Sequence, residues 1–238
     1  MDNNLLQIKV KQRLNKLASE DYDNIECWQI QEAFNKAQLE FCRRQIHGNN
    51  QRQEGDESTK MLIDDMQKLL VNQSINMIYT STSCPHYYQT GTLFTNYLYF
   101  KRMEVDATSE CCDDRCLRVH LEEVADVNEL LADELSKPSA EWGETFCTIA
   151  DNKINVYTDG TFNLKTTAKL HYYRKPVNVE FNGCINPSND IAYTADVECE
   201  FKDDIAEILV DETVAILAGD VELFNNYQRT KQNATMNN

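Results

Sequence analysis

The sequence predicts an α+β fold, in which N- and C-terminal helices form a helical core and a β-rich insertion of about six strands lies between them. Near both ends of the chain, apolar residues recur at steps of three and four, which is typical of amphipathic helices. In the middle, Tyr, Thr, Ile and Phe are dense and Pro and Gly interrupt the pattern, which is typical of strands. The predicted division is 1–74 for the N-terminal helices, 75–200 for the insertion, 201–230 for a C-terminal helix that packs on them, and 231–238 for a tail.

The clearest helical pattern lies at 25–46, where a single buried face would carry Cys27, Ile30, Phe34, Ala37 and Phe41. Gly48 follows, and glycine readily takes the left-handed conformation that ends many helices. The closing helix, expected over 201–229, has Asp203 and Asp204 in its first turn, where the helix dipole favours negative charge. Further helical segments are expected at 5–18, at 58–72 and, as a shorter turn, at 126–139.

Six strands are expected in the β-rich part, because β-branched and aromatic residues cluster there between turn residues. They are 75–80, 96–105, 117–124, 144–150, 153–158 and 166–174, with a short additional strand at 177–181. Asp159-Gly160 predicts a tight turn between the last two strands of this series.

Composition indicates a soluble protein that is made and kept in a cytoplasm. The apolar fraction of 42% can supply a core, and no apolar run approaches the ~18 residues that span a bilayer, so no membrane association is expected. The first residues lack the apolar stretch of a signal peptide. The nine cysteines are odd in number and scattered, so most are expected to be reduced thiols.

The net charge of −16 is unevenly spread along the chain. Residues 101–151 hold five basic and fourteen acidic residues. A protein that grips DNA phosphates needs the opposite sign. An acidic surface repels DNA instead, which would suit the wall of a channel that DNA passes without adhering. The alternative explanation is solubility alone.

One cluster has metal-like residue types. Cys112, Cys116 and His120 would supply three zinc ligands, with Cys111 or Asp114 as a fourth. Structural zinc sites use a second pair of ligands further along the chain, and this sequence lacks one. The sequence therefore predicts no metal and no cofactor, and the cluster is interpreted as a loop with reduced cysteines.

No catalytic pattern is present. The chain has neither a GxSxG elbow nor a GxxxxGK[ST] phosphate loop. Cys84 and His86 flank a proline on a turn, where their side chains would point apart instead of forming an activated pair. The sequence therefore predicts that the protein is not an enzyme.

A basic and aromatic run, with Tyr172, Tyr173, Arg174 and Lys175, interrupts this acidic chain. One interpretation is a nucleic-acid patch, with stacking and phosphate contacts. A second is an edge strand that Pro176 ends. A third is a surface that contacts the acidic 101–151 stretch of an adjacent copy. The last two are preferred over the first because of the net charge.

Three stretches carry a family resemblance: QIKVKQRLNKLASEDYDNIECWQIQEAFNKAQLEFCRR near the start, HLEEVADVNELLADELSKPSAEWGETFCTIADNKINVYTDGTFNLKTTAKLHYYRKP at 120–176, and FKDDIAEILVDETVAILAGDVELFNNYQR at 201–229. In texture and order they resemble virion structural proteins of crAss-like and related tailed bacteriophages. The resemblance implies an oligomeric ring protein, usually of twelve copies, in the head-to-tail connector or upper tail of the virion. It implies assembly in the host bacterial cytoplasm, the portal protein and adjacent tail ring proteins as partners, and DNA only as non-specific passage through the channel.

A structural ring subunit is therefore the expected function. The alternative is a cytoplasmic protein-binding module, which zinc would stabilise through Cys112, Cys116 and His120, and a nucleic-acid accessory protein ranks below both. The expected subunit-interface residues are Tyr172, Tyr173, Arg174, Lys175, Phe224, Tyr227 and Arg229.

Overall fold

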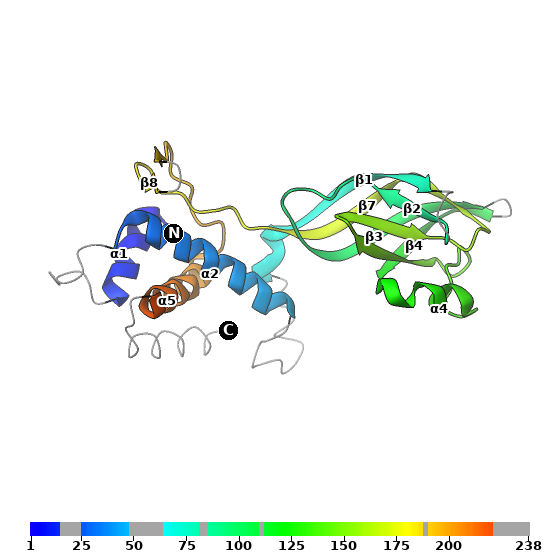
Figure 1. The fold of residues 1–238 in the computed structure, drawn as a ribbon, viewed down its shortest axis with the longest axis horizontal. Helices are drawn as coiled ribbons and strands as arrows, with labels where there is room; N and C mark the ends of the chain where they lie inside the picture. The colour runs from blue at the N-terminus through cyan, green and yellow to red at the C-terminus, as the bar shows by residue number, and fades with distance from the viewer. Residues whose placement is uncertain (15–24, 48–63, 81–84, 110–111, 188–189, 221–238) are drawn as a thin grey trace. The chain divides into compact units, whose positions relative to one another are not determined.

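The computed structural model describes residues 1–14, 25–47, 64–80, 85–109, 112–187 and 190–220 (Figure 1). Their contacts divide the chain into two compact units. One unit is the continuous segment Leu69–Lys175, and the other combines Met1–Lys68 with Pro176–Asn238. The sequence analysis placed the corresponding boundaries near residues 74 and 200.

The first unit is a closed β-barrel of seven strands, in the order β1-β2-β6-β5-β4-β3-β7. Neighbouring strands are antiparallel except β4 and β5, which are parallel and are joined through the crossover that contains α4. The elements are β1 (Leu70–Thr80), β2 (Tyr87–Thr90), β3 (Tyr97–Ser109), β4 (Cys112–Leu121), η3 (Val124–Asp126), α4 (Val127–Ala132), β5 (Glu144–Ala150), β6 (Lys153–Tyr157) and β7 (Asn163–Arg174).

The expected fold class is wrong. The structure is a mostly β protein with a closed seven-stranded barrel and short helices, not a helical core with a β insertion of about six strands. Two local causes are visible. The helix expected over 58–72 gives way at Leu70 to β1, and β2 was not predicted at all. The short strand expected at 177–181 is absent apart from a single bridge between Glu180 and Val197.

Side chains fill the interior of the barrel. Alternate residues of β3 (Met103, Val105 and Ala107) face it, and so do Ala168 and Leu170 of β7. This alternation follows from the two-residue period of a strand. The turn between β5 and β6 holds Asp151 and Asn152 at φ of 51° and 57°. Asp and Asn tolerate this left-handed conformation, which two-residue hairpin turns require.

The second unit is built on α1 (Asn3–Arg13), α2 (Cys27–His47) and α5 (Asp203–Asp220), with η2 (Gln67–Leu69) at its boundary with the barrel and the hairpin β8 (Ile185–Asn186) and β9 (Ile191–Ala192). The predicted stripe of α2 is buried at Ile30, Phe34, Ala37 and Phe41. In the described part of the chain, no helix is both long and apolar enough to cross a membrane.

Amide side chains of α2 bind the extended segment that enters this unit after Pro176. Asn35 accepts from the Val179 amide at 2.8 Å and donates to the Val179 carbonyl at 3.2 Å. One turn earlier, Gln31 accepts from the Phe181 amide at 3.3 Å. These positions lie four apart, so they share one face of the helix. These two side chains thus provide hydrogen-bond partners for backbone groups of Val179 and Phe181, which in a sheet would bond to a neighbouring strand.

A disulfide joins Cys27, the first residue of α2, to Cys184. The expectation that most cysteines are reduced therefore fails for this pair. Cys42, Cys116, Cys147 and Cys199 are free thiols.

A buried ion pair joins α2 to α5, between Arg44 and Glu212. The Glu212 carboxylate is only 3% exposed, so its charge depends on this partner. We expect Arg44→Leu to lower the free energy of unfolding by about 3–5 kcal/mol, because it leaves a buried charge unpaired. Urea unfolding measures this loss.

Two variants control that measurement. Arg43→Leu changes an exposed neighbour and should stay within about 0.5 kcal/mol of the wild type. Combining Arg44→Leu with Glu212→Leu should recover most of the loss, because no buried charge remains. An equal loss at Arg43 would show that the ion pair is not the cause.

Candidate functional site

Two oppositely charged surfaces lie on the outside of the barrel. The first, here called the basic patch, is formed where the start of β3 pairs with the end of β7. These two stretches, 97–103 and 169–175, contain five basic residues and no acidic one. The basic patch consists of Lys101, Arg102, Lys169, Arg174 and Lys175, of which all but the half-buried Arg174 are exposed. Arg102 forms an ion pair with Glu104, so the remaining four residues supply the net positive charge of the patch.

Tyr172 and Tyr173 do not lie on this surface, although the sequence placed them at an interface. Tyr172 is fully buried in the barrel, stacks on Phe94 with ring centroids 5.5 Å apart, and donates to Asn96 at 3.1 Å. Tyr173 is 9% exposed, and the Lys101 ammonium lies 6.0 Å from its ring centroid. The edge-strand interpretation is also wrong, because β7 pairs with β1 on one side and β3 on the other.

Arg174 and Lys175 remain candidates for an interface, and the structure adds Lys101, Arg102 and Lys169 to them. Strand pairing brings these residues together from stretches about seventy residues apart. The other three expected interface residues, Phe224, Tyr227 and Arg229, lie outside the described part of the chain.

The second surface, here called the acidic groove, lies between the end of β4, the segment after α4 and the start of β5. Between Glu122 and Glu144 the chain carries eight acidic residues and one lysine. The groove has a volume of about 460 Å³. The side chains that line it include four carboxylates and two exposed apolar groups: Glu122, Glu134, Glu141, Glu144, Leu135 and Trp142.

Two tight turns hold apolar side chains at this groove. Asp133 accepts from the Ser136 hydroxyl at 2.7 Å and from the Leu135 amide at 3.3 Å, and these bonds lower the pKa of its carboxyl. Ser139 accepts from the Trp142 amide through its hydroxyl and bridges to Glu144. Leu135 is consequently 74% exposed and Trp142 is 65% exposed.

Sequence reasoning missed Leu135 and Trp142. The available signal was an apolar residue inside each of two turns that Asp133 and Ser139 cap with their side chains. Large apolar side chains held outward by capped turns are not part of the core. An exposed tryptophan beside carboxylates provides both a flat apolar surface and negative charge for a cationic side chain.

The candidate zinc ligands are not brought together. Cys112, Cys116 and His120 all lie on β4. Residues four apart on a strand are separated by roughly 13 Å, whereas zinc ligands must all lie within about 2.3 Å of the metal. Cys116 and His120 are exposed. Among the described residues, no group of three or more His, Cys, Asp or Glu side chains could hold a metal.

A shallow depression on the outside of β7 and β3 holds a small network of ion pairs. The Lys165 ammonium lies 2.8 Å from Asp114 and 3.7 Å from Asp106. The hydrogen bond to Asp114, followed by the charge of both carboxylates, raises the pKa of Lys165. Cys116 also lines the depression. Exposed pairs of this kind contribute little stability, and the lysine is neutralised, so it does not extend the basic patch.

Comparison with protein-family models and with curated proteins finds no match for this sequence. The function must therefore be argued from the two charged surfaces.

His171, beside the basic patch, allows a test of how burial and the nearby positive charges affect the pKa of a side chain. It is 22% exposed, its Nε2 lies 4.0 Å from Glu104, and that nitrogen has no hydrogen-bond partner. Burial, then the charges of Arg102 and Lys169, lower the pKa of His171 below its usual 6.5. As the pH falls through 6.5, the unfolded chain therefore takes up a proton that the folded chain does not.

We expect the free energy of unfolding to fall between pH 7 and pH 5, and His171→Asn to remove part of this fall. Urea unfolding at both pH values measures it. His120→Asn, which changes an exposed histidine on β4, should keep the wild-type pH dependence. An unchanged pH dependence in His171→Asn would contradict the assignment.

The prediction that the chain binds no zinc is also testable. We expect Cys116→Ser combined with His120→Asn to leave the free energy of unfolding within about 0.5 kcal/mol of the wild type, because both side chains are exposed. EDTA should have no effect on unfolding. Stoichiometric zinc in the purified protein, together with chelator-induced unfolding, would instead support the zinc-stabilised module.

Proposed function

We propose that this chain is a non-catalytic subunit of a closed protein ring, in which the basic patch of one barrel contacts the acidic groove of the next. The observation that carries the proposal is the presence of both surfaces on one rigid barrel. A homo-oligomer in which two different patches meet is heterologous, and it closes into a ring when the rotation between neighbours allows it.

The positions of the two surfaces support this arrangement. The basic patch centres on β7, and the acidic groove lies at β5. In the closed strand order, β5 is three strands from β7 in one direction and four in the other. The centres of the two surfaces therefore lie on different strands, although the patch extends to β3 and the groove to β4, which pair with each other. We expect the groove carboxylates, which follow β4 and precede β5, to contact the basic patch of a neighbouring copy.

The chemistry of the surfaces is also complementary. The basic patch offers two arginines and three lysines, and the acidic groove offers carboxylates beside Trp142. An arginine over a tryptophan face gains a cation–π interaction in addition to its ion pairs. Tryptophan and arginine are over-represented among the residues that contribute most to binding in protein interfaces. Leu135 adds apolar area at the same groove.

The setting follows from the resemblance. We propose that the ring belongs to the head-to-tail connector or upper tail of a tailed phage related to the crAss-like group, that it contacts the portal protein and adjacent ring proteins, and that it contains about twelve copies. The net charge of −16 supports a channel wall that DNA passes without adhering.

Charge reversal tests the contact directly. One variant reverses the basic patch (Lys101→Glu, Arg174→Glu, Lys175→Glu), and a second reverses the acidic groove (Glu134→Lys, Glu141→Lys, Glu144→Lys). Each alone should fail to assemble, because like charges then meet across the contact. A 1:1 mixture should assemble again, because subunits that alternate restore every contact. Native mass spectrometry, with the chain alone and with the portal protein, measures the outcome.

A matched control reverses Lys36 and Arg43, two exposed residues of α2, and should assemble like the wild type. High salt should weaken assembly of the wild type, because it screens exposed charges. Normal assembly of both reversed variants would refute the contact. A wild-type chain that stays monomeric under every condition would refute the ring.

A further inference from the structure

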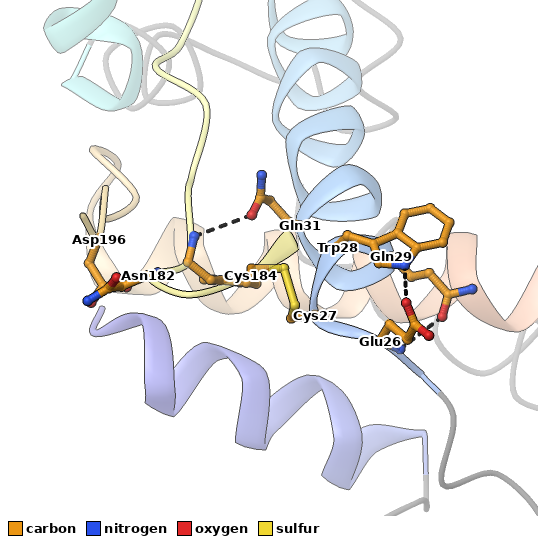
Figure 2. Close-up of a disulfide and its surroundings, with 9 residues drawn as sticks. Glu26, Cys27, Trp28, Gln29, Gln31, Asn182, Cys184 and Asp196 are labelled. Carbon is orange, nitrogen blue, oxygen red and sulfur yellow. Dashed lines mark hydrogen bonds between the residues drawn. A yellow bond between two sulfur atoms is a disulfide. The ribbon is translucent and has the colours of Figure 1, made fainter. Parts of the chain in front are cut away.

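The helical unit contains two cysteines, Cys27 and Cys184, that form a disulfide, whereas Cys42, Cys116, Cys147 and Cys199 are free thiols. Cys27 is partly exposed at the first position of α2, and its sulfur is bonded to Cys184, which is 3% exposed (Figure 2). A thiolate at a helix N-terminus is stabilised by the unsatisfied amides of the first turn. Cys27 is thus placed to react with a soluble disulfide, and Cys184 is placed to resolve the product.

The buried thiols are protected from the same reaction. Burial raises the pKa of Cys42 and of Cys147 to about 12, and it also raises the pKa of Cys199. All three are protonated at neutral pH and shielded from reagents. Cys116 is exposed, but among the described residues it has no cysteine partner. Among the cysteines whose side chains the structure describes, oxidation to an internal disulfide is therefore selective for Cys27 and Cys184.

We propose that Cys27 and Cys184 form a reversible modification site, oxidised by thiol–disulfide exchange with a small disulfide such as glutathione disulfide, which fastens the β8–β9 hairpin to α2. The Cys27 thiolate attacks the small disulfide, forms a mixed disulfide and releases one glutathione thiolate. The Cys184 thiolate then attacks the Cys27 sulfur and releases the second. The two protons of the protein thiols end on the two glutathione molecules.

The β8–β9 hairpin depends on the Cys27–Cys184 disulfide more than residues 177–181 do. Residues 177–181 are held by the amide side chains of α2 in either redox state. Among the described residues, the strands of the hairpin pair at two positions, Ile185 with Ala192 and Asn186 with Ile191, and the Tyr193 amide donates to the Cys184 carbonyl at the base. Isolated two-stranded hairpins are marginally stable in water. The disulfide at Cys184 fixes its base directly on α2.

The hairpin also presents apolar side chains. Ile185 is 55% exposed and Ile191 is 63% exposed. Formation of the disulfide therefore determines how firmly Ile185 and Ile191 are held on α2. In a reducing cytoplasm the disulfide would be absent, and the backbone hydrogen bond from the Gly183 amide to the Tyr193 carbonyl at 2.9 Å would still join the two sides of the hairpin.

Two measurements test the site on the full chain. After incubation with glutathione disulfide, denaturation and alkylation with N-ethylmaleimide should label Cys42, Cys116, Cys147 and Cys199 and leave Cys27 and Cys184 unlabelled in one cross-linked peptide. Hydrogen exchange should then be at least about ten-fold faster at 182–193 in the reduced protein than in the oxidised protein, because local opening becomes easier. Exchange at 177–181 should not change.

The variant Cys27→Ser should show the fast exchange under both conditions, and Cys116→Ser should behave as the wild type. If Cys27→Ser does not fold, the wild type with and without dithiothreitol gives the same comparison. Labelling of all nine cysteines after oxidation, or equal exchange at 182–193 in both redox states, would overturn the proposal.

Discussion

The pairing of β7 with two partners is the constraint on which the outside of the barrel depends. β7 pairs with β1 on one side and β3 on the other, so it closes the cylinder and fixes the register of both. In this register Ala168 and Leu170 face inward while Lys169 and His171 face outward. A shift of one residue would exchange the two sets, which the apolar interior prevents. The outward position of Lys169 follows from this register, whereas Arg174, at the end of the strand and in step with Leu170 and Tyr172, is half-buried.

The crossover between β4 and β5 determines the acidic groove. Because these two strands are parallel, the chain must return along the outside of the barrel before β5 begins. It does so through α4, which packs Val127 against Phe146 and Tyr157. The return path also carries the acidic residues and the two capped turns. The acidic groove therefore results from the parallel pairing of β4 and β5 and the crossover that it requires.

In the helical unit, side chains form hydrogen bonds to backbone groups that in the barrel bond to neighbouring strands. The segment after Pro176 has buried backbone groups that require partners, and α2 supplies them through Gln31 and Asn35. The Cys27–Cys184 bond extends the same attachment to the base of the hairpin. Polar side chains on α2 thus hold the returning chain, while the apolar stripe of the same helix faces the core.

The sequence by itself determined the local structure where one pattern dominated. The stripe of α2 and the strand at 144–150 were predicted almost residue by residue, since periodicity depends only on near neighbours. The charge imbalance of residues 101–151 was also visible in the sequence. Only the tertiary structure decided that the strands close into a barrel, that Tyr172 is buried and that Lys101 lies over the ring of Tyr173. These facts depend on pairing between strands that are distant in the sequence. The residue pattern of β1 or of β7 is the same whether or not the two strands pair, so it does not reveal the pairing. The same holds for the disulfide, whose cysteines are 157 residues apart.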